Sequence, residues 1–335
     1  EGNLDSGNGE ITLRANGELS TASGGNRTIQ SGSGDIHLLA ETLVFDGGAA
    51  NNTTVTSTGV LTIAPSETST DGFKNVGSQI EFEGSVTSDQ YASIAADTNG
   101  LIIDGVSTLG GLTIGADGGY ITNSASDAGS RVRFEIDSGN FEINGPVTIY
   151  GYDVTVADSG SASRFGTQSG NIVLKAGNNI SLDGRVRATS STLTLDAGGT
   201  VTQAAALTAD SLALSGSGDF TLTNSGNNVA TLAGGSSGTP LGAVEYLDVD
   251  ALTIDTVNPT GLTASGDIFV ATNLGNLTVS QNIATTSSSP TAIVLAAGAD
   301  VTGGGIVSPG TGNIVISGDP SLSVGTGGTI ALYSG

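Results

Sequence analysis

The stretch Leu193–Gly216, LTLDAGGTVTQAAALTADSLALSG, returns in altered form later in the sequence as Ile293–Gly318, IVLAAGADVTGGGIVSPGTGNIVISG. In both copies, alternating apolar residues lead to a glycine-containing corner, then to a Val-Thr pair and a second apolar run closed by Ser-Gly. Internal repetition has to be considered before any local motif, because stacked-repeat architectures are recognised by it. The sequence therefore predicts a protein built from repeated structural units.

A shorter motif, Gly-polar-apolar-x-apolar, runs through the whole chain. Its glycines are Gly9, Gly34, Gly139, Gly170, Gly218, Gly266, Gly275, Gly312 and, more loosely, Gly59. Glycine permits a sharp corner, the Asn or Asp that follows suits the same corner, and apolar residues at i and i+2 lie on one face of a strand. Because Gly9, Gly34 and Gly59 are 25 residues apart, we expect a corner and a strand to recur once per turn of a coil.

Composition and periodicity together define the fold class. Of 335 residues 53 are Gly, while Cys, Met and Trp are absent and aromatic residues make up 4%, which indicates a narrow core of small aliphatic side chains. No window has sustained helical spacing of apolar residues, whereas two-residue alternation between corner residues is frequent. The sequence predicts an all-β chain. A parallel β-solenoid is favoured over tandem antiparallel β-sandwiches, because a sandwich has no reason to repeat one unit every 25 residues.

We expect one continuous β-solenoid over residues 1–335. Residues 1–65 and 169–335 form regular rungs, and residues 66–168 form less regular rungs with loops or insertions that carry most of the aromatic and many of the charged side chains. The second apolar residue of each strand pair is predicted to point into the core; these residues are Leu174, Leu182, Leu195, Leu214, Leu222, Val270, Val279 and Ile316.

The regular C-terminal half also resembles a known family. The stretches Asn171–Gly184, Leu193–Gln203, Phe220–Leu232, Leu252–Asp255 and Gly261–Ile268 are similar to the repeats of filamentous-haemagglutinin-like surface proteins. The resemblance implies a right-handed parallel β-helix within a very large protein that two-partner or autotransporter secretion exports to the bacterial cell surface, where it acts as an adhesin or a fibre. The absence of Met is expected of a processed product or a segment of such a polypeptide.

The charge pattern excludes some partners. The net charge is −23, and all nine Lys and Arg residues lie at or before Arg187. Nucleic-acid binding requires basic patches, an acidic surface is repelled by anionic membranes, and no apolar run approaches the ~20 residues that span a bilayer. We therefore expect neither nucleic-acid binding nor direct membrane insertion, and we interpret the acidity as keeping a repetitive protein soluble.

Few residues carry chemistry. His37 is the only histidine, and its position between two apolar residues predicts an outward, solvated side chain. Asp248 and Asp250 would share one face of a strand, but two carboxylates do not make a calcium site, so a solvated face is the favoured interpretation. The sequence predicts no enzymatic activity, no cofactor, and no catalytic, cofactor-binding or metal-binding residue.

Two pairs of arginines, Arg131 with Arg133 and Arg185 with Arg187, have members that share a strand face. Outward pairs of this kind can hold an anionic sugar, on which the aromatic rings of Tyr150–Tyr152 can stack. The alternative, which we favour, is that the arginines pair with acidic residues of adjacent rungs.

Three classes of function follow. The leading one is a non-enzymatic structural or adhesive segment of a large extracellular bacterial surface protein, with further copies or repeats end to end and host or matrix glycans or cell surfaces as partners. The alternatives are a carbohydrate-active β-helix, meaning a polysaccharide lyase or hydrolase, and an ice-binding solenoid. The last needs a flat array of Thr-x-Thr, and the examples at Thr54, Thr192 and Thr221 do not recur in register.

Overall fold

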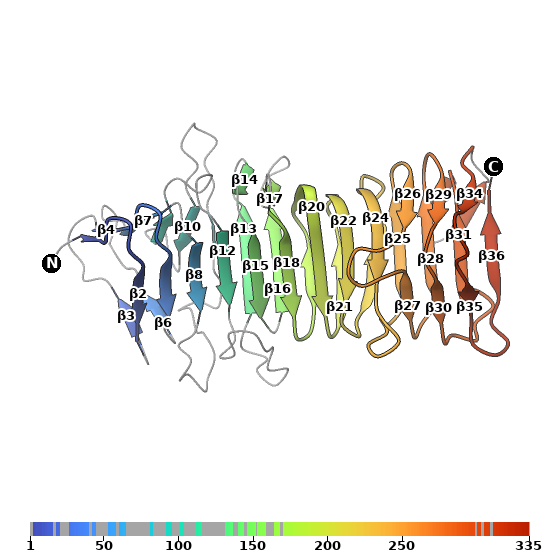
Figure 1. The fold of residues 1–335 in the computed structure, drawn as a ribbon, viewed down its shortest axis with the longest axis horizontal. Coiled ribbons are helices and arrows are strands. Elements are labelled where there is room, and N and C mark those ends of the chain that lie inside the picture. Colours follow the sequence, from blue (N-terminus) through green and yellow to red (C-terminus); the bar gives the residue numbers. More distant parts are fainter. Residues whose placement is uncertain are drawn as a thin grey trace. The chain divides into compact units, whose positions relative to one another are not determined.

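The computed structural model describes residues 3–15, 18–20, 27–39, 42–44, 53–57, 60–64, 81–82, 92–95, 101–103, 111–115, 131–136, 140–143, 146–151, 153–158, 164–167, 170–298, 300–302, 305–308 and 311–334. Every regular element within these residues is a β-strand (Figure 1). The chain divides into two compact units: unit 1 comprises residues 1–177 and 183–188, and unit 2 comprises residues 178–182 and 189–335.

Unit 1 is built from short strands that pair across successive rungs. They are β1 (Leu4–Asp5), β2 (Ile11–Arg14), β3 (Glu18–Ser20), β4 (Arg27–Gln30), β5 (Ile36–Leu39), β6 (Thr42–Val44), β7 (Thr53–Thr56), β8 (Val60–Ala64), β9 (Glu81–Phe82), β10 (Ala92–Ala95), β11 (Leu101–Ile103), β12 (Gly111–Gly115), β13 (Arg131–Ile136), β14 (Asn140–Ile143), β15 (Val147–Gly151), β16 (Asp153–Asp158), β17 (Arg164–Thr167), β18 (Ile172–Ala176) and the first residues of β20 (Arg185–Ala197).

The pairing in unit 1 is mostly parallel. One series runs β2–β5–β8–β12–β15–β18, and another runs β14–β17–β20. In the first series Ile11 pairs with Ile36 and Ile36 with Leu61, so the 25-residue spacing predicted from Gly9 and Gly34 is the length of one rung. β10 is an exception, because it runs antiparallel to both β9 and β11.

Unit 2 continues with the same kind of element. Its strands are β19 (Ile180–Leu182), the remainder of β20, β21 (Thr200–Gln203), β22 (Leu207–Ser215), β23 (Asp219–Leu222), β24 (Asn228–Gly234), β25 (Val244–Asp248), β26 (Leu252–Ile254), β27 (Leu262–Ala264), β28 (Ile268–Thr272), β29 (Leu277–Val279), β30 (Ile283–Thr285), β31 (Ile293–Ala296), β32 (Asp300–Thr302), β33 (Gly305–Ser308), β34 (Ile314–Ile316), β35 (Leu322–Ser323) and β36 (Ile330–Tyr333).

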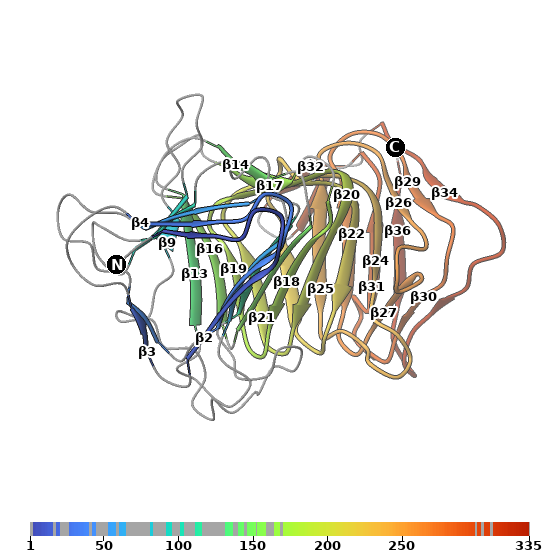
Figure 2. The same ribbon diagram turned by 60° about the vertical axis from the view of Figure 1, so that its left-hand side comes forward.

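Each complete rung of unit 2 contributes one strand to a first sheet and either one long strand or two short strands to a second sheet. The first sheet is the parallel series β19–β21–β23–β25–β28–β31–β36, whose strands follow one another in Figure 2. The second sheet contains the parallel series β22–β24–β26–β29–β34 and β27–β30–β35. The fold is therefore the all-β parallel solenoid that the corner-and-strand motif predicts, and the alternative of tandem antiparallel sandwiches is wrong.

The core confirms the predicted strand register. Leu174, Leu182, Leu195, Leu214, Leu222, Val270 and Val279 all have no exposed surface. Ile316 pairs in register with the buried Val279, as the predicted face requires, but half of its surface is exposed. β34, which carries Ile316, pairs with β29 on one side, and within the described residues no strand stacks on its other side.

Polar residues at or just before the start of strands connect one rung to the next. The Asn179 side-chain oxygen accepts a hydrogen bond from the Thr200 amide at 2.8 Å, and the Asp219 carboxylate accepts one from the Ala243 amide at 2.7 Å. The same contact joins Asn3 to Thr28, Asn276 to Asn313 and Asn282 to Ser321. We call this contact the rung tether. At Asp219 and Asn276 it gives the Asp or Asn of the sequence motif a second role, since the side chain also satisfies a backbone donor of the following rung.

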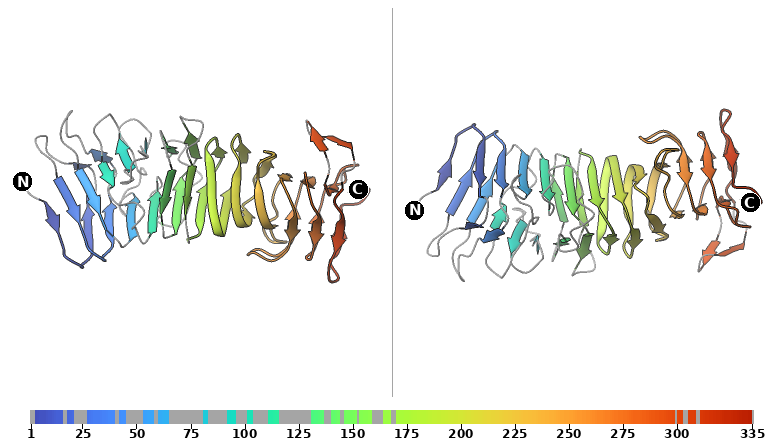
Figure 3. Two further views of the ribbon diagram at one scale, coloured as in Figure 1. Left: turned by 90° about the horizontal axis from the view of Figure 1, so that it is seen from above. Right: turned by 90° about the horizontal axis from the view of Figure 1, so that it is seen from below.

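One rung of unit 2 is lengthened by a hairpin. Ile293 of β31 pairs with Ile330 of β36, and the chain between them forms the antiparallel pair β32–β33. Figure 3 shows these two strands standing away from the stacked strands of the unit. The stack therefore accepts an insertion at a corner without losing the register of its first sheet.

Candidate functional site

A buried tyrosine–aspartate pair lies where β25 ends and the chain turns toward β26. The Tyr246 hydroxyl donates a hydrogen bond to Asp248 Oδ2 at 2.7 Å. The same oxygen accepts the Val229 amide at 2.9 Å, and Asp248 Oδ1 accepts the Asp250 amide at 3.1 Å. Neither Tyr246 nor Asp248 has exposed surface, so the pair belongs to the interior of unit 2.

Burial controls the protonation of this pair. Desolvation raises the pKa of Asp248 from 3.8 to about 6, although its three hydrogen bonds act in the opposite direction. Desolvation, followed by the neighbouring Asp248 charge, also raises the pKa of Tyr246 well above 10.0. The carboxyl group of Asp248 is therefore the proton-accepting group of this corner near neutral pH.

The corner is reinforced by a buried amide. Asn227, which has no exposed surface, donates hydrogen bonds to Gln203 Oε1 at 3.1 Å and to the Leu247 carbonyl oxygen at 3.1 Å. Its side-chain oxygen accepts the Leu207 amide at 3.1 Å. One side chain thus joins three successive rungs, and no feature of the sequence distinguishes Asn227 from the other corner asparagines.

The prediction that Asp248 and Asp250 share a solvated strand face is wrong. β25 ends at Asp248, whose side chain points inward, while Asp250 lies beyond the strand and is exposed. Asp250 instead accepts a hydrogen bond from the Asn228 amide group at 3.3 Å. Among the described residues no three His, Cys, Asp or Glu side chains converge to hold a metal ion. Because the pair is inaccessible to a substrate, its chemistry is limited to taking up and releasing a proton.

Three arginines form a row on the outer side of unit 1. Arg164 of β17 pairs in register with Arg185 of β20, and Arg187 lies two residues further along β20. Phe165 and Val186, their neighbours in sequence, are buried, so the arginines face outward; Arg185 is exposed and the other two are half-buried. We call Arg164, Arg185 and Arg187 the arginine row. Paired strands are separated by about 4.8 Å, so the row concentrates three positive charges in a chain that has only nine.

The arginine row contains one predicted pair and one residue that the sequence argument missed. Arg164 is 21 residues from Arg185, so only the rung register brings them together. The other predicted pair, Arg131 with Arg133, lies on β13 in register with Asp153 and Thr155, and is not part of this series of strands.

Of the two tyrosines considered for stacking on a sugar, the structure describes only Tyr150. Tyr150 is buried, with 5% of its surface exposed, so its ring is not available to a sugar. Tyr152 lies outside the described residues. The interpretation of Tyr150–Tyr152 as a stacking platform is therefore wrong for Tyr150.

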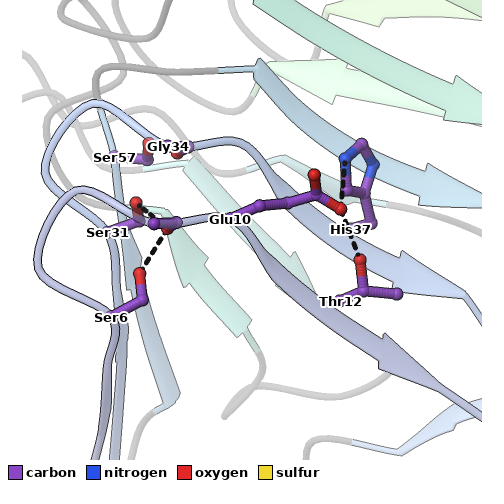
Figure 4. A network of polar contacts seen from close by, with 8 residues as sticks. Ser6, Glu10, Thr12, Ser31, Gly34, His37 and Ser57 are labelled. Atoms are coloured by element: carbon purple, nitrogen blue, oxygen red, sulfur yellow. Dashed lines mark hydrogen bonds and ion pairs between the residues drawn. The ribbon is translucent and has the colours of Figure 1, made fainter.

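His37 points outward from β5 as predicted, but it is not simply solvated. Its Nε2 atom lies 3.7 Å from Glu10 Oε1, and 20% of its side-chain surface is exposed. The same carboxylate oxygen accepts a hydrogen bond from the Thr12 hydroxyl at 2.9 Å (Figure 4). This contact joins adjacent rungs at the surface, where even a charged pair contributes only about 0–1 kcal/mol to stability.

Buried serines near this pair connect successive rungs. The Ser31 hydroxyl donates to the Gly9 carbonyl oxygen at 2.8 Å, and the Ser57 hydroxyl donates to the Gly34 carbonyl oxygen at 2.7 Å (Figure 4). Both serines are 1% exposed. The polar groups of this region therefore hold the rungs together.

Fold and site together define a parallel β-solenoid whose polar groups mainly connect successive rungs. Comparison of the chain with protein-family models, with curated proteins and with solved structures gave no match. The described residues include no helix of the length and apolarity needed to cross a membrane.

Proposed function

We propose that the chain is a non-enzymatic structural and adhesive segment of a large extracellular bacterial surface protein or fibre. The observation that carries the proposal is that each rung is joined to the next by strand pairing and by side-chain hydrogen bonds. The first sheet of unit 2 keeps its register from β19 to β36, and the rung tether recurs in both units. Such units propagate along one axis with nearest-neighbour contacts only, which suits a spacer that holds an adhesive surface away from a cell.

The resemblance to filamentous-haemagglutinin-like repeats supports the same proposal. It adds that further repeats are arranged end to end and that the location is the bacterial cell surface. Host or matrix glycans are the proposed partners of the adhesive role.

Labelling of intact cells tests the location, and an activity assay tests the non-enzymatic part. Antibodies against the chain should label the source bacterium without permeabilisation. The purified chain should release no unsaturated or reducing ends from polygalacturonate, while a polysaccharide lyase under the same conditions does. Labelling confined to permeabilised cells, or turnover that disappears in Arg133→Ala, contradicts the proposal.

An ice-binding role is the second candidate. The pairing of the strands places hydroxyl-bearing side chains in a column across successive rungs, and this column could not be recognised from the sequence. Ser211, Thr231, Thr253 and Thr278 occupy paired positions on four successive strands of the second sheet. The adjacent column does not repeat threonine, since Ala213 and Ala233 occupy two of its positions. Thermal hysteresis of the purified chain, compared with a Thr253→Val variant, separates this candidate from the structural one.

A further inference from the structure

We propose that the outer face of the first sheet of unit 2 binds a glycan chain that carries free amino groups. Two aromatic side chains, Phe269 and Tyr333, provide the stacking surface, and the carboxylates of Glu245 and Asp267 recognise the amino groups. The inference rests on the adhesive function proposed above, to which it adds the chemical class of the glycan and the residues that bind it.

The strand register places the two aromatic residues on the same face. β28, β31 and β36 are consecutive strands of the first sheet (Figure 1). Phe269 lies between two fully buried residues of β28, so its side chain faces outward. On β36, Tyr333 pairs in register with Ala296, which pairs with Ala271, two residues beyond Phe269. The two aromatics are therefore separated by two steps of about 4.8 Å across the sheet and by two residues along the strands.

Small side chains occupy the positions between the two aromatics. Val294 on β31 pairs with Phe269, and Ala296 on the same strand pairs with Tyr333. Val294 pairs on its other side with Ala331 of β36. Because valine and alanine side chains are short, the two aromatic side chains are the most prominent apolar groups of this part of the face.

Both aromatics are accessible, and one of them is fixed in place. Phe269 packs against Leu247, Ala271 and Ala296, which are buried and pair with one another on the outer side of the strands. The side chain of Phe269 nevertheless remains partly exposed, and Tyr333 is 43% exposed. Aromatic side chains that are already held by packing lose little conformational entropy on binding a ligand.

The size of this surface favours a sugar over a protein partner. A stable protein interface buries about 800 Å² on each partner, whereas a fully buried aromatic side chain supplies about 150–250 Å². Two partly covered rings and a few small side chains provide too little area for such an interface. A pyranose ring fits better, because it presents an apolar face of C–H groups to an aromatic ring and hydroxyl groups at its rim.

Carboxylates beside Phe269 determine which glycans are bound. Glu245 of β25 is exposed and pairs in register with Phe269, and Asp267 precedes Phe269 by two residues on the same outward side. Unit 2 contains ten acidic residues and no Lys, Arg or His. Chains that carry uronate, sulfate or sialate groups are therefore repelled, whereas a protonated amino group is attracted by both carboxylates and by the aromatic ring.

Asp267 is held in place before any ligand binds. Its carboxylate accepts hydrogen bonds from the hydroxyls of Ser287 and Thr291, the latter at 2.9 Å. Burial alone would raise the pKa of Asp267, but the hydroxyl contacts outweigh it and lower that pKa. The carboxylate therefore stays ionised under the mildly acidic conditions in which an amino sugar is protonated.

Isothermal titration calorimetry of the whole chain with matched oligosaccharides tests the proposal. The probes are a linear hexamer of glucosamine, the same hexamer with N-acetylated amino groups, and a hexamer of galacturonate. In mildly acidic buffer the wild type should bind the glucosamine hexamer most tightly and the acetylated hexamer more weakly. It should not bind the galacturonate hexamer, because the surface of unit 2 repels its charge.

Substitutions on the face separate stacking from charge. Tyr333→Ala and Phe269→Leu should each weaken binding of the glucosamine hexamer by about tenfold, which is the loss expected for one aromatic contact. The leucine keeps the apolar packing against the outer cluster, so that variant should fold. Glu245→Gln should weaken binding of the glucosamine hexamer and leave that of the acetylated hexamer unchanged.

Two control variants alter the second sheet instead. Asp210→Asn removes one exposed negative charge from β22, and Val315→Ala shortens an exposed apolar side chain on β34. Both should bind the glucosamine hexamer as the wild type does. Far-ultraviolet circular dichroism checks that every variant is folded.

Three results overturn the proposal: a wild type that does not bind the glucosamine hexamer, an effect of Asp210→Asn equal to that of Glu245→Gln, or full affinity in both Tyr333→Ala and Phe269→Leu. A lysine hexamer that binds as tightly, with the same dependence on Phe269 and Tyr333, also overturns it, because the face then recognises a basic peptide. Cell-surface labelling and turnover are measured independently. Labelled cells and absent turnover, together with no binding of the hexamer, would overturn this inference alone and leave the proposed function standing.

Discussion

Replacing Asp248 with Asn removes the one carboxylate that we expect to make unit 2 more stable in mild acid. Asp248 is buried and has a pKa raised to about 6 from 3.8. Between these two values the native state binds a proton that the unfolded state does not. The free energy of unfolding therefore increases as the pH falls through about 6 toward 3.8, and decreases as the pH rises.

The magnitude follows from the displacement of the pKa. A pKa shift of about two units corresponds in full to a change of about 3 kcal/mol in the free energy of unfolding. About 2 kcal/mol of this stability is gained when the pH falls from about 7 to about 4. Asp248→Asn abolishes this dependence. At neutral pH the variant avoids burying a charge but loses one hydrogen bond, that from the Asp250 amide, which is worth about 1 kcal/mol. We therefore expect it to be at least as stable as the wild type near pH 7.

Urea unfolding followed by circular dichroism at a series of pH values measures this effect. Asp210→Asn is the matched control, because Asp210 is exposed and its replacement removes one negative charge without altering the interior. The control should retain the slope of the wild type between about pH 7 and about pH 4, and Asp248→Asn should lose it. A wild type and an Asp248→Asn variant with the same pH slope would refute the assignment of that proton to Asp248.

Three further predictions concern the same interior and its tethers. Tyr246→Phe removes a hydrogen bond that favours the ionised Asp248 carboxylate. The midpoint of the pH dependence of the free energy of unfolding should therefore move above about 6. A midpoint that stays in place or falls contradicts this prediction. Leu195→Ala should lower the free energy of unfolding by about 2–5 kcal/mol. Ile316→Ala should lower it by less than about 1 kcal/mol, because Ile316 is half exposed. Equal decreases for the two variants in urea unfolding would argue against the difference in burial. Asp219→Ala should lower the free energy of unfolding by about 1 kcal/mol, because it leaves the Ala243 amide without its acceptor. Asp219→Asn should lower it little, because the side-chain amide oxygen can replace the carboxylate oxygen. Similar unfolding midpoints for the two variants would exclude the tether.

Local spacing predicted the rungs well, because the corner-and-strand motif has a direct geometric meaning. The motifs at Gly9, Gly34, Gly170, Gly218, Gly266, Gly275 and Gly312 each lead directly into a strand. Close packing explains why glycine is required at such corners. A Cβ atom on Gly218 would lie 1.8 Å from the Gly199 carbonyl oxygen of the preceding rung.

The longer repeat was less informative. Leu193 lies on β20, which pairs in the second sheet, whereas Ile293 lies on β31 in the first sheet. The two copies are therefore not equivalent positions of the solenoid. Both sheets require the same inward alternation, so similar sequences can occupy either one, and rung lengths that differ between turns shift the sequence relative to the sheets.

Contacts between rungs could not be predicted from residues that are neighbours in sequence. Arg164 meets Arg185 only through the pairing of β17 with β20. Asp248 appeared to share a face with Asp250, but the strand ends at Asp248 and the chain then turns. The end of a strand and the partner across a rung both depend on tertiary structure, which one sequence does not contain.

The rung tether has a direction that bears on how the chain is made. In every example the side chain that accepts the bond belongs to the earlier rung and the amide that donates it belongs to the later one. During synthesis or passage through a pore with the N-terminus leading, each acceptor is in position before its donor emerges. The finished part of the molecule is thus a template for the next turn, and folding can advance vectorially, one turn at a time, without waiting for the rest of the polypeptide.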